Sequence, residues 1–213
     1  MRKNQYNILV FLLLSVYTAS AQDYDFQLWT SLSTKDRITY KTDVYVKHAL
    51  RFRENASLLD KSFSEIKVKY KYNKNFSLGF GFRDINVFDA SFSRNQYSRH
   101  FIDVYLREKE NRFIFSVRNR FQNQRDFKNY NRVFRQKFSV NYNIRKTKFD
   151  PTIAFEYFYT EQKKIDKLRY TLSFSHSLLD DLDIDLSYRI QQLLSESYAN
   201  LIFIFDCKLS YRF

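Results

Sequence analysis

Residues 65–72 alternate strictly between charged and apolar side chains, and this period of two constrains the fold more than any other feature of the sequence. Successive side chains of a β-strand point to opposite faces, whereas a helix would mix the two sets. One face of the segment carries apolar and aromatic side chains and the other carries charged ones: Ile66, Val68, Tyr70 and Tyr72 against Glu65, Lys67, Lys69 and Lys71. The alternation recurs along nearly the whole chain, which predicts an all-β protein.

Eleven segments show this alternation and are the candidate strands. The first, residues 26–32, is the weakest. In chain order the others are residues 38–52, 63–72, 76–87, 97–107, 112–122, 132–142, 152–159, 167–178, 182–190 and 200–213. Within the fourth candidate the apolar positions shift by one after Phe82, which indicates a β-bulge near Arg83 and Asp84.

The N-terminus has the parts of a secretory signal peptide. Two basic residues follow the first methionine, residues 8–16 form a short apolar run, and Ala-Ser-Ala at 19–21 is a small-residue cleavage site. A membrane anchor would need about 20 apolar residues, and this run is shorter. We therefore predict a signal peptide at 1–21 and one β-barrel domain at 22–213.

Alternation alone fits two kinds of barrel. A lipocalin-type barrel is soluble, binds a ligand and keeps apolar side chains inside, whereas an outer-membrane barrel turns them toward lipid. Export, long strands and an aromatic content of 19% favour the membrane kind. A lipid-facing lysine costs about 2–4 kcal/mol near the midplane, so Lys67, Lys69 and Lys71 are predicted to face the lumen.

The predicted fold is a single transmembrane antiparallel up-and-down β-barrel of 10–12 strands, with short periplasmic turns and longer extracellular loops. The short connections fall near residues 73–75, 109–110, 146–147 and 179–181. The longer polar ones fall near residues 54–61, 89–96, 123–131, 160–166 and 194–198. Bacterial single-chain barrels have even strand counts, so eleven candidates imply ten or twelve strands, and the alternation of Phe26 with Leu28 favours twelve.

The last segment ends at Phe213, with Leu209 and Tyr211 on the same face. It resembles the C-terminal assembly signal of bacterial outer-membrane barrels, and the resemblance implies recognition by the barrel-assembly machinery. The predicted location is the outer membrane of a Gram-negative bacterium, where outer-membrane lipid surrounds the barrel.

Three further stretches carry a family resemblance. They are Phe-Gln-Leu-Trp-Thr at 26–30, Leu-Arg-Phe-Arg-Glu-Asn at 50–55 leading to Phe63, and Tyr-Lys-Tyr-Asn-Lys-Asn-Phe-Ser-Leu-Gly-Phe-Gly at 70–81. These resemble the domain-of-unknown-function 2490 family of outer-membrane barrels, over most of the mature chain. The resemblance implies the barrel fold, and the family brings no established activity or catalytic residues to carry over.

The predicted lumen face is strongly basic, with eighteen basic residues against seven acidic ones. The basic residues most firmly assigned to it are Lys67, Lys69, Lys71, Arg118, Arg120, Arg135 and Lys137. The surplus cations must meet water or bound anions, because an unpaired buried charge is costly. Two interpretations remain open: a small pore that favours anionic solutes, and a structural membrane protein whose narrow lumen is plugged by its own side chains.

A lipid hydrolase is the alternative hypothesis. Ser98 and His100 share the predicted lipid face of one strand, and Asn119 lies on that face of the next. A two-residue turn at 109–110 would place His100 opposite Asn119. A nucleophile, a base and an orienting amide would resemble the outer-membrane phospholipase site, although Ser and His stand in reversed order. Polar positions at a strand end explain these residues more simply, and we predict no enzyme activity.

The sequence offers no other site. It contains no glycine-rich phosphate loop, no nucleotide motif and no metal-spaced histidines or cysteines, and its single cysteine is Cys207. We therefore predict no cofactor and no metal. A formal charge of +13 can attract nucleic acid, but an exported chain rarely meets it. Trp29 is predicted to anchor the barrel at the membrane interface.

Overall fold

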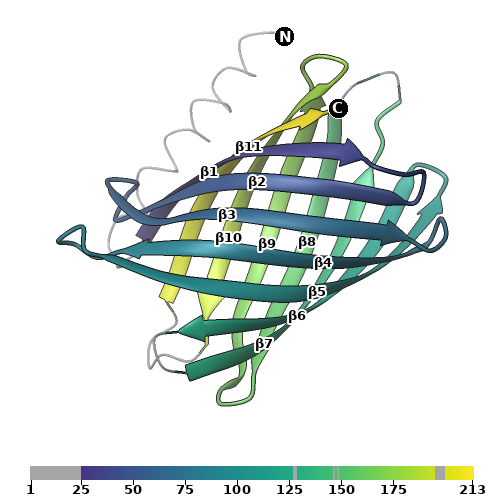
Figure 1. Ribbon diagram of the computed structural model, residues 1–213. Coiled ribbons are helices and arrows are strands. Elements are labelled where there is room, and N and C mark those ends of the chain that lie inside the picture. The colour runs from purple at the N-terminus through teal and green to yellow at the C-terminus, as the bar shows by residue number, and fades with distance from the viewer. Residues whose placement is uncertain (1–24, 127–128, 146, 148, 195–199) are drawn as a thin grey trace, which may run out of the picture.

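The computed structural model describes residues 25–126, 129–145, 147, 149–194 and 200–213. The predicted signal peptide at 1–21 lies outside the described residues. Within them, eleven strands follow one another in chain order and form one sheet that closes into a barrel (Figure 1). In the same part of the chain, no helix is both long and apolar enough to cross a membrane.

The strands are 12 to 17 residues long, which exceeds the roughly 9–11 residues that a tilted transmembrane strand needs. Neighbours in the chain pair antiparallel all around the barrel, which confirms the predicted up-and-down fold. In order the strands are β1 Asp25–Arg37, β2 Thr42–Arg53, β3 Leu58–Lys71, β4 Phe76–Phe88, β5 Arg94–Glu110, β6 Phe113–Asp126, β7 Asn129–Tyr142, β8 Phe149–Thr160, β9 Lys164–Ser177, β10 Leu182–Leu193 and β11 Asn200–Arg212.

The strand count of the described residues, eleven, lies within the predicted range, but the expectation of an even number is wrong. The segment at 26–32 belongs to a full strand, because β1 pairs with β2 on one edge and with β11 on the other. The β1–β11 pair is parallel, with Lys35 opposite Arg212. An odd number of strands can close only in this way, because its first and last members run in the same direction.

The strands also extend into most of the segments predicted as long loops. The β2–β3 connection is reduced to residues 54–57 and the β4–β5 connection to residues 89–93. The expected contrast between short turns and long loops is therefore weak in the described connections. Alternation could not reveal these extensions, because a strand that leaves the apolar layer carries polar side chains on both faces.

Asparagine and aspartate shape the turns in a chain that has two glycines and one proline. The Oδ1 atom of Asn73 accepts hydrogen bonds from two following backbone N–H groups, at 2.9 and 2.7 Å. Asn111 adopts a φ of 54°, a left-handed conformation that asparagine tolerates. In the β4–β5 connection the Ser91 hydroxyl donates to Asp89, and this bond is the main reason that the pKa of Asp89 lies below its ordinary value.

The bulge predicted at Arg83 and Asp84 does not form. β4, which is described throughout, pairs with β3 and β5 without a shift in register. The apolar positions change faces because Ile85 points into the barrel, where it packs with Ala49 and Phe63 in a buried cluster. The sequence shift thus marks an apolar patch on the inner wall rather than an extra residue.

Gly81 also faces the lumen and makes room for an aromatic ring of β5. A Cβ atom on Gly81 would lie 2.1 Å from Cζ of Phe101, far inside any real contact distance. The buried Phe101 ring in turn lies against the guanidinium of Arg120, with 3.7 Å between the Cζ atom and the ring centroid. Glycine is required here because the backbone and the ring approach so closely.

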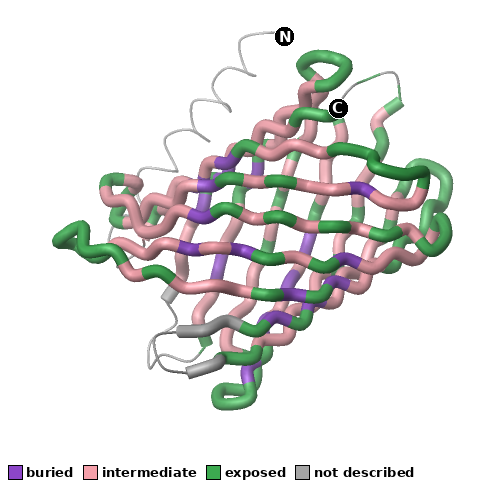
Figure 2. The backbone as a smooth tube through the Cα atoms, in the orientation of Figure 1, coloured by how far each residue is buried: buried purple, intermediate pink, exposed green. Residues whose placement is uncertain are grey.

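The outer wall exposes large apolar side chains along most strands. Figure 2 shows that exposed and half-buried stretches alternate along the backbone. Examples are Val46, Ile66, Val68, Phe80, Ile102, Phe115, Phe121, Ile153 and Leu172. A soluble lipocalin-type barrel would turn such side chains inward, so that alternative is wrong. An apolar outer face and a charged inner face are the architecture of an outer-membrane barrel.

Aromatic rings gather at the barrel end that holds the β1–β2, β3–β4 and β5–β6 turns and the C-terminus. Ring pairs with centroids 4.9–6.2 Å apart are Tyr72 with Phe76, Phe113 with Tyr142, and Tyr211 with Phe213. Such rings are typical of a membrane interface. Leu209, Tyr211 and Phe213 lie at this end, and the Phe213 N–H donates to the Lys35 carbonyl at 3.0 Å. Their role as an assembly signal stays a prediction.

Candidate functional site

The inward side chains enclose a cavity of about 530 Å³, which we call the basic cavity. Fourteen lysines and arginines line it, against three acids. The basic residues are Lys47, Arg51, Lys61, Lys67, Arg83, Arg99, Arg118, Arg120, Arg135, Lys137, Lys167, Arg169, Arg189 and Lys208, and the acids are Glu65, Glu156 and Asp166. So many like charges inside one enclosure repel one another strongly unless water or anions screen them.

The lumen residues singled out from the sequence divide between the cavity and the barrel end. Those that line the basic cavity are Lys67, Arg118, Arg120, Arg135 and Lys137. Lys71 lies nearer the end of β3, where its Nζ atom is 2.7 Å from Oδ2 of Asp43. The Nζ atom of Lys69 lies 4.5 Å from the centroid of the Tyr105 ring. The outer two lysines of the β3 row are thus held by neighbours on the barrel wall.

Glu156 on β8 is the centre of the most densely charged part of the cavity. Its buried Oε1 atom accepts hydrogen bonds from Arg118 at 2.7 Å and from Arg135 at 2.9 Å. Its Oε2 atom accepts a third bond, from Arg169 at 3.4 Å. The register also places Lys137 directly beside both Arg118 and Glu156. One carboxylate therefore gathers three guanidinium groups from three different strands.

A second buried ion pair braces the wall next to this group. Asp103 is fully buried, and its carboxylate accepts hydrogen bonds from Nε and Nη2 of Arg120, with lengths of 2.6 and 2.7 Å. The Tyr105 hydroxyl donates to the same carboxylate at 2.7 Å. Such a two-bond fork fixes a guanidinium in direction as well as in place. Asp103 is thereby fully engaged by Arg120 and Tyr105.

Several cations of the basic cavity form no ion pair with any acid that the structure describes. None of the ion pairs among the described residues includes Arg51, Lys47, Lys67, Lys137 or Lys167. Some of them lie instead over aromatic rings, as Lys67 does over Tyr45 at 4.3 Å. Aromatic faces attract cations, but they supply no full negative charge. The lining as a whole therefore keeps a large positive excess.

Trp29, the single tryptophan, is buried in the barrel, so its predicted place at the membrane interface is wrong. The Arg51 guanidinium lies 3.8 Å from its ring, and those of Arg169 and Arg189 lie 5.3 Å away. The negative face of the indole helps to hold these cations together. The signal was present in the sequence, since Trp29 shares its strand face with Ser31 rather than with the apolar residues of β1.

The predicted hydrolase constellation is not assembled. The β5–β6 turn begins two residues later than expected, so His100 pairs with Asn123 rather than with Asn119. Ser98 lies opposite Asp84 of β4, on the other edge of the strand. In the part of the chain that the structure describes, no group of three or more histidines, cysteines, aspartates or glutamates could hold a metal ion. The register therefore does not bring Ser98, His100 and Asn119 together as the sequence predicted.

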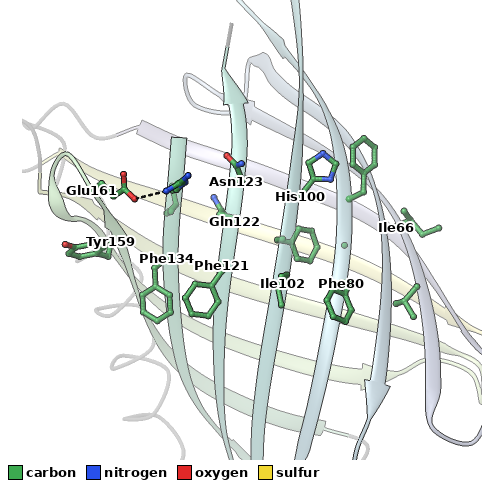
Figure 3. A pocket seen from close by; sticks show the side chains of 16 residues that line it. Ile66, Phe80, His100, Ile102, Phe121, Gln122, Asn123, Phe134, Tyr159 and Glu161 are labelled. Atoms are coloured by element: carbon green, nitrogen blue, oxygen red, sulfur yellow. Dashed lines mark ion pairs between the residues drawn. The ribbon is translucent and has the colours of Figure 1, made fainter. Parts of the chain in front are cut away.

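A second hollow, of about 780 Å³, lies on the outer wall (Figure 3). Its apolar lining includes Ile66, Phe80, Ile102, Phe121 and Phe134. Polar groups edge it on one side, among them His100, Asn123 and the exposed pair of Arg132 with Glu161, 3.7 Å apart. Lipid chains cover surfaces of this kind on a membrane barrel, so the hollow belongs to the lipid-facing wall.

Comparisons with known proteins give a family but no activity. The family model described as "Protein of unknown function (DUF2490)" matches residues 26–200, which is most of the barrel. Among solved structures, the beta domain of the Bordetella autotransporter BrkA is similar with a TM-score of 0.47 and 10% sequence identity, over 78% of this chain and 82% of that one. Among curated proteins, none matches.

Proposed function

The chain belongs to the DUF2490 family of proteins of unknown function, and we propose that it is an outer-membrane barrel whose basic cavity admits small anions and lets them pass. The observation that carries this proposal is the gathering of fourteen cations in the cavity lining, of which Lys47, Arg51, Lys67, Lys137 and Lys167 form no ion pair with a described acid. In a low-dielectric enclosure such an excess concentrates anions and repels cations. The proposed partners are outer-membrane lipid, the assembly machinery during biogenesis, and small anionic solutes. We propose neither nucleic acid binding nor enzyme activity for this chain.

The size of the barrel supports a narrow path rather than a wide one. Barrels of about 8 strands are filled by side chains, and those of 16–18 strands leave an open channel. The eleven described strands fall between these limits. The buried cluster of Ala49, Phe63 and Ile85 packs on the inner wall, while the basic cavity has room for several water molecules. We therefore expect small currents.

Current measurements in planar bilayers across a KCl gradient test the proposal. The refolded mature chain is expected to give a reversal potential of the sign that chloride sets. Replacing both Lys67 and Lys137 with glutamine is expected to reduce this anion preference. No described acid forms an ion pair with either lysine, so the change leaves no known partner unpaired. The control removes the same charge from the exposed Lys74 and Lys164 and should change the preference less. Absence of current, or preference for potassium, would overturn the conducting function.

A further inference from the structure

We infer that the basic cavity contains a binding site for a tetrahedral oxyanion of the phosphate class, built by Arg118, Arg135 and Arg169 around Glu156. This inference deepens the proposed function by naming the class of anion, and it rests on that proposal because the anion must reach the cavity. Both inorganic phosphate and the phosphate groups of small solutes have the required shape and charge.

The three guanidinium groups are already gathered but only partly used. Each donates one hydrogen bond to Glu156 through a terminal nitrogen. The Nε atoms of Arg118, Arg135 and Arg169 are buried and have no hydrogen-bond partner among the described residues. A guanidinium often donates two parallel hydrogen bonds to one oxyanion. The Nε–H groups that lack a partner are therefore the donors available to a bound phosphate.

The charge of the group also matches the ligand class. Three guanidiniums and one carboxylate leave an excess of positive charge, and Lys137 adds to it from the neighbouring position on β7. A phosphate ester carries a charge of about −1.5 to −2 at neutral pH. This charge is close in size to the two positive charges that the three guanidiniums keep beyond Glu156. Chloride would compensate one charge at most and cannot use the paired geometry of a guanidinium. The site should therefore distinguish phosphate from chloride.

The fluorescence of Trp29 can report anion binding at this site. The Arg169 guanidinium lies 5.3 Å from the indole ring and also donates to Glu156. An anion that draws Arg169 toward itself changes the charge over the indole and hence its fluorescence. Because the chain has one tryptophan, the whole tryptophan signal comes from this position.

The test is a fluorescence titration of the refolded chain in detergent with sodium phosphate, against sodium chloride at matched ionic strength. Phosphate is expected to produce a saturating change at concentrations at least about tenfold lower than chloride, since charge-assisted hydrogen bonds are the stronger ones. Replacing Arg135 with glutamine should weaken phosphate binding by about tenfold. The control, Arg132→Gln, removes the same charge from an exposed position on the same strand and should leave binding unchanged.

Equal responses to phosphate and chloride would overturn the site, and so would equal losses in the two arginine variants. If Arg135→Gln does not fold, Arg118→Gln serves in its place, because Arg118 donates to the same oxygen of Glu156. Anion-selective currents without a phosphate preference would contradict the oxyanion site and leave the pore standing. Saturable phosphate binding without any current would contradict conduction and leave the oxyanion site standing.

Discussion

Replacing Glu156 with glutamine is expected to lower the free energy of unfolding by about 3–5 kcal/mol, as the loss of one partner from a buried ionic group does. The carboxylate is the shared acceptor of Arg118, Arg135 and Arg169. Without its charge, three half-buried guanidiniums repel one another with no acid between them. Phosphate should restore part of the lost stability, because it replaces the missing negative charge.

Urea unfolding in lipid vesicles, with and without phosphate, measures both effects. Glu161→Gln is the matched control, since Glu161 pairs with Arg132 on the surface at 3.7 Å and such exposed pairs contribute about 1 kcal/mol or less. A Glu156→Gln variant as stable as the control would show that the three arginines do not depend on this carboxylate. A variant that phosphate fails to stabilise would count against the oxyanion site.

Replacing Ile102 with arginine is expected to destabilise the barrel in a membrane by about 2–4 kcal/mol, the cost of a cation on the lipid face near the midplane. Ile102 lies in the middle of β5 and is flanked across the strands by Phe80 and Phe121. All three side chains are exposed on the outer wall. On a soluble protein the same exposed substitution would change stability by no more than about 0.5 kcal/mol.

The same unfolding assay separates these two cases when a second arginine is placed outside the membrane layer. Leu178 is exposed in the β9–β10 connection, so Leu178→Arg should cost only about 0–1 kcal/mol, as expected near the interface. A cost that depends on depth supports a lipid-facing wall. Equal and small costs at both positions would contradict the placement of this wall in a bilayer.

Alternation was sufficient to predict the strands and the direction of most side chains. It predicted that the β3 lysines point inward and that Ile66 and Val68 point outward, as they do in the structure. The pairing of Glu156 with Arg169 was also within reach, because it follows from the register of one hairpin. Its bond to Arg118 was not, since that arginine reaches across β7 from two strands away.

The wrong predictions for His100, Trp29 and Ile85 have local structural causes. The β5–β6 turn contains the left-handed Asn111 and lies two residues later than predicted. This shift places His100 opposite Asn123 instead of Asn119. Trp29 was placed by its residue type rather than by its strand face. Ile85 points inward because the lumen itself contains an apolar patch, which a rule of charged inside and apolar outside does not foresee.

Site-directed spin labelling along residues 65–71 in lipid vesicles tests most directly whether the apolar face of β3 meets lipid and its lysines point into the barrel. Single cysteines are introduced in a Cys207→Ala background, and each label is exposed to oxygen or to a water-soluble nickel chelate. Labels at Ile66, Val68 and Tyr70 should respond mainly to oxygen, and labels at Lys67 and Lys69 mainly to the chelate. The reverse phase, or no period of two, would contradict a membrane barrel with a basic interior.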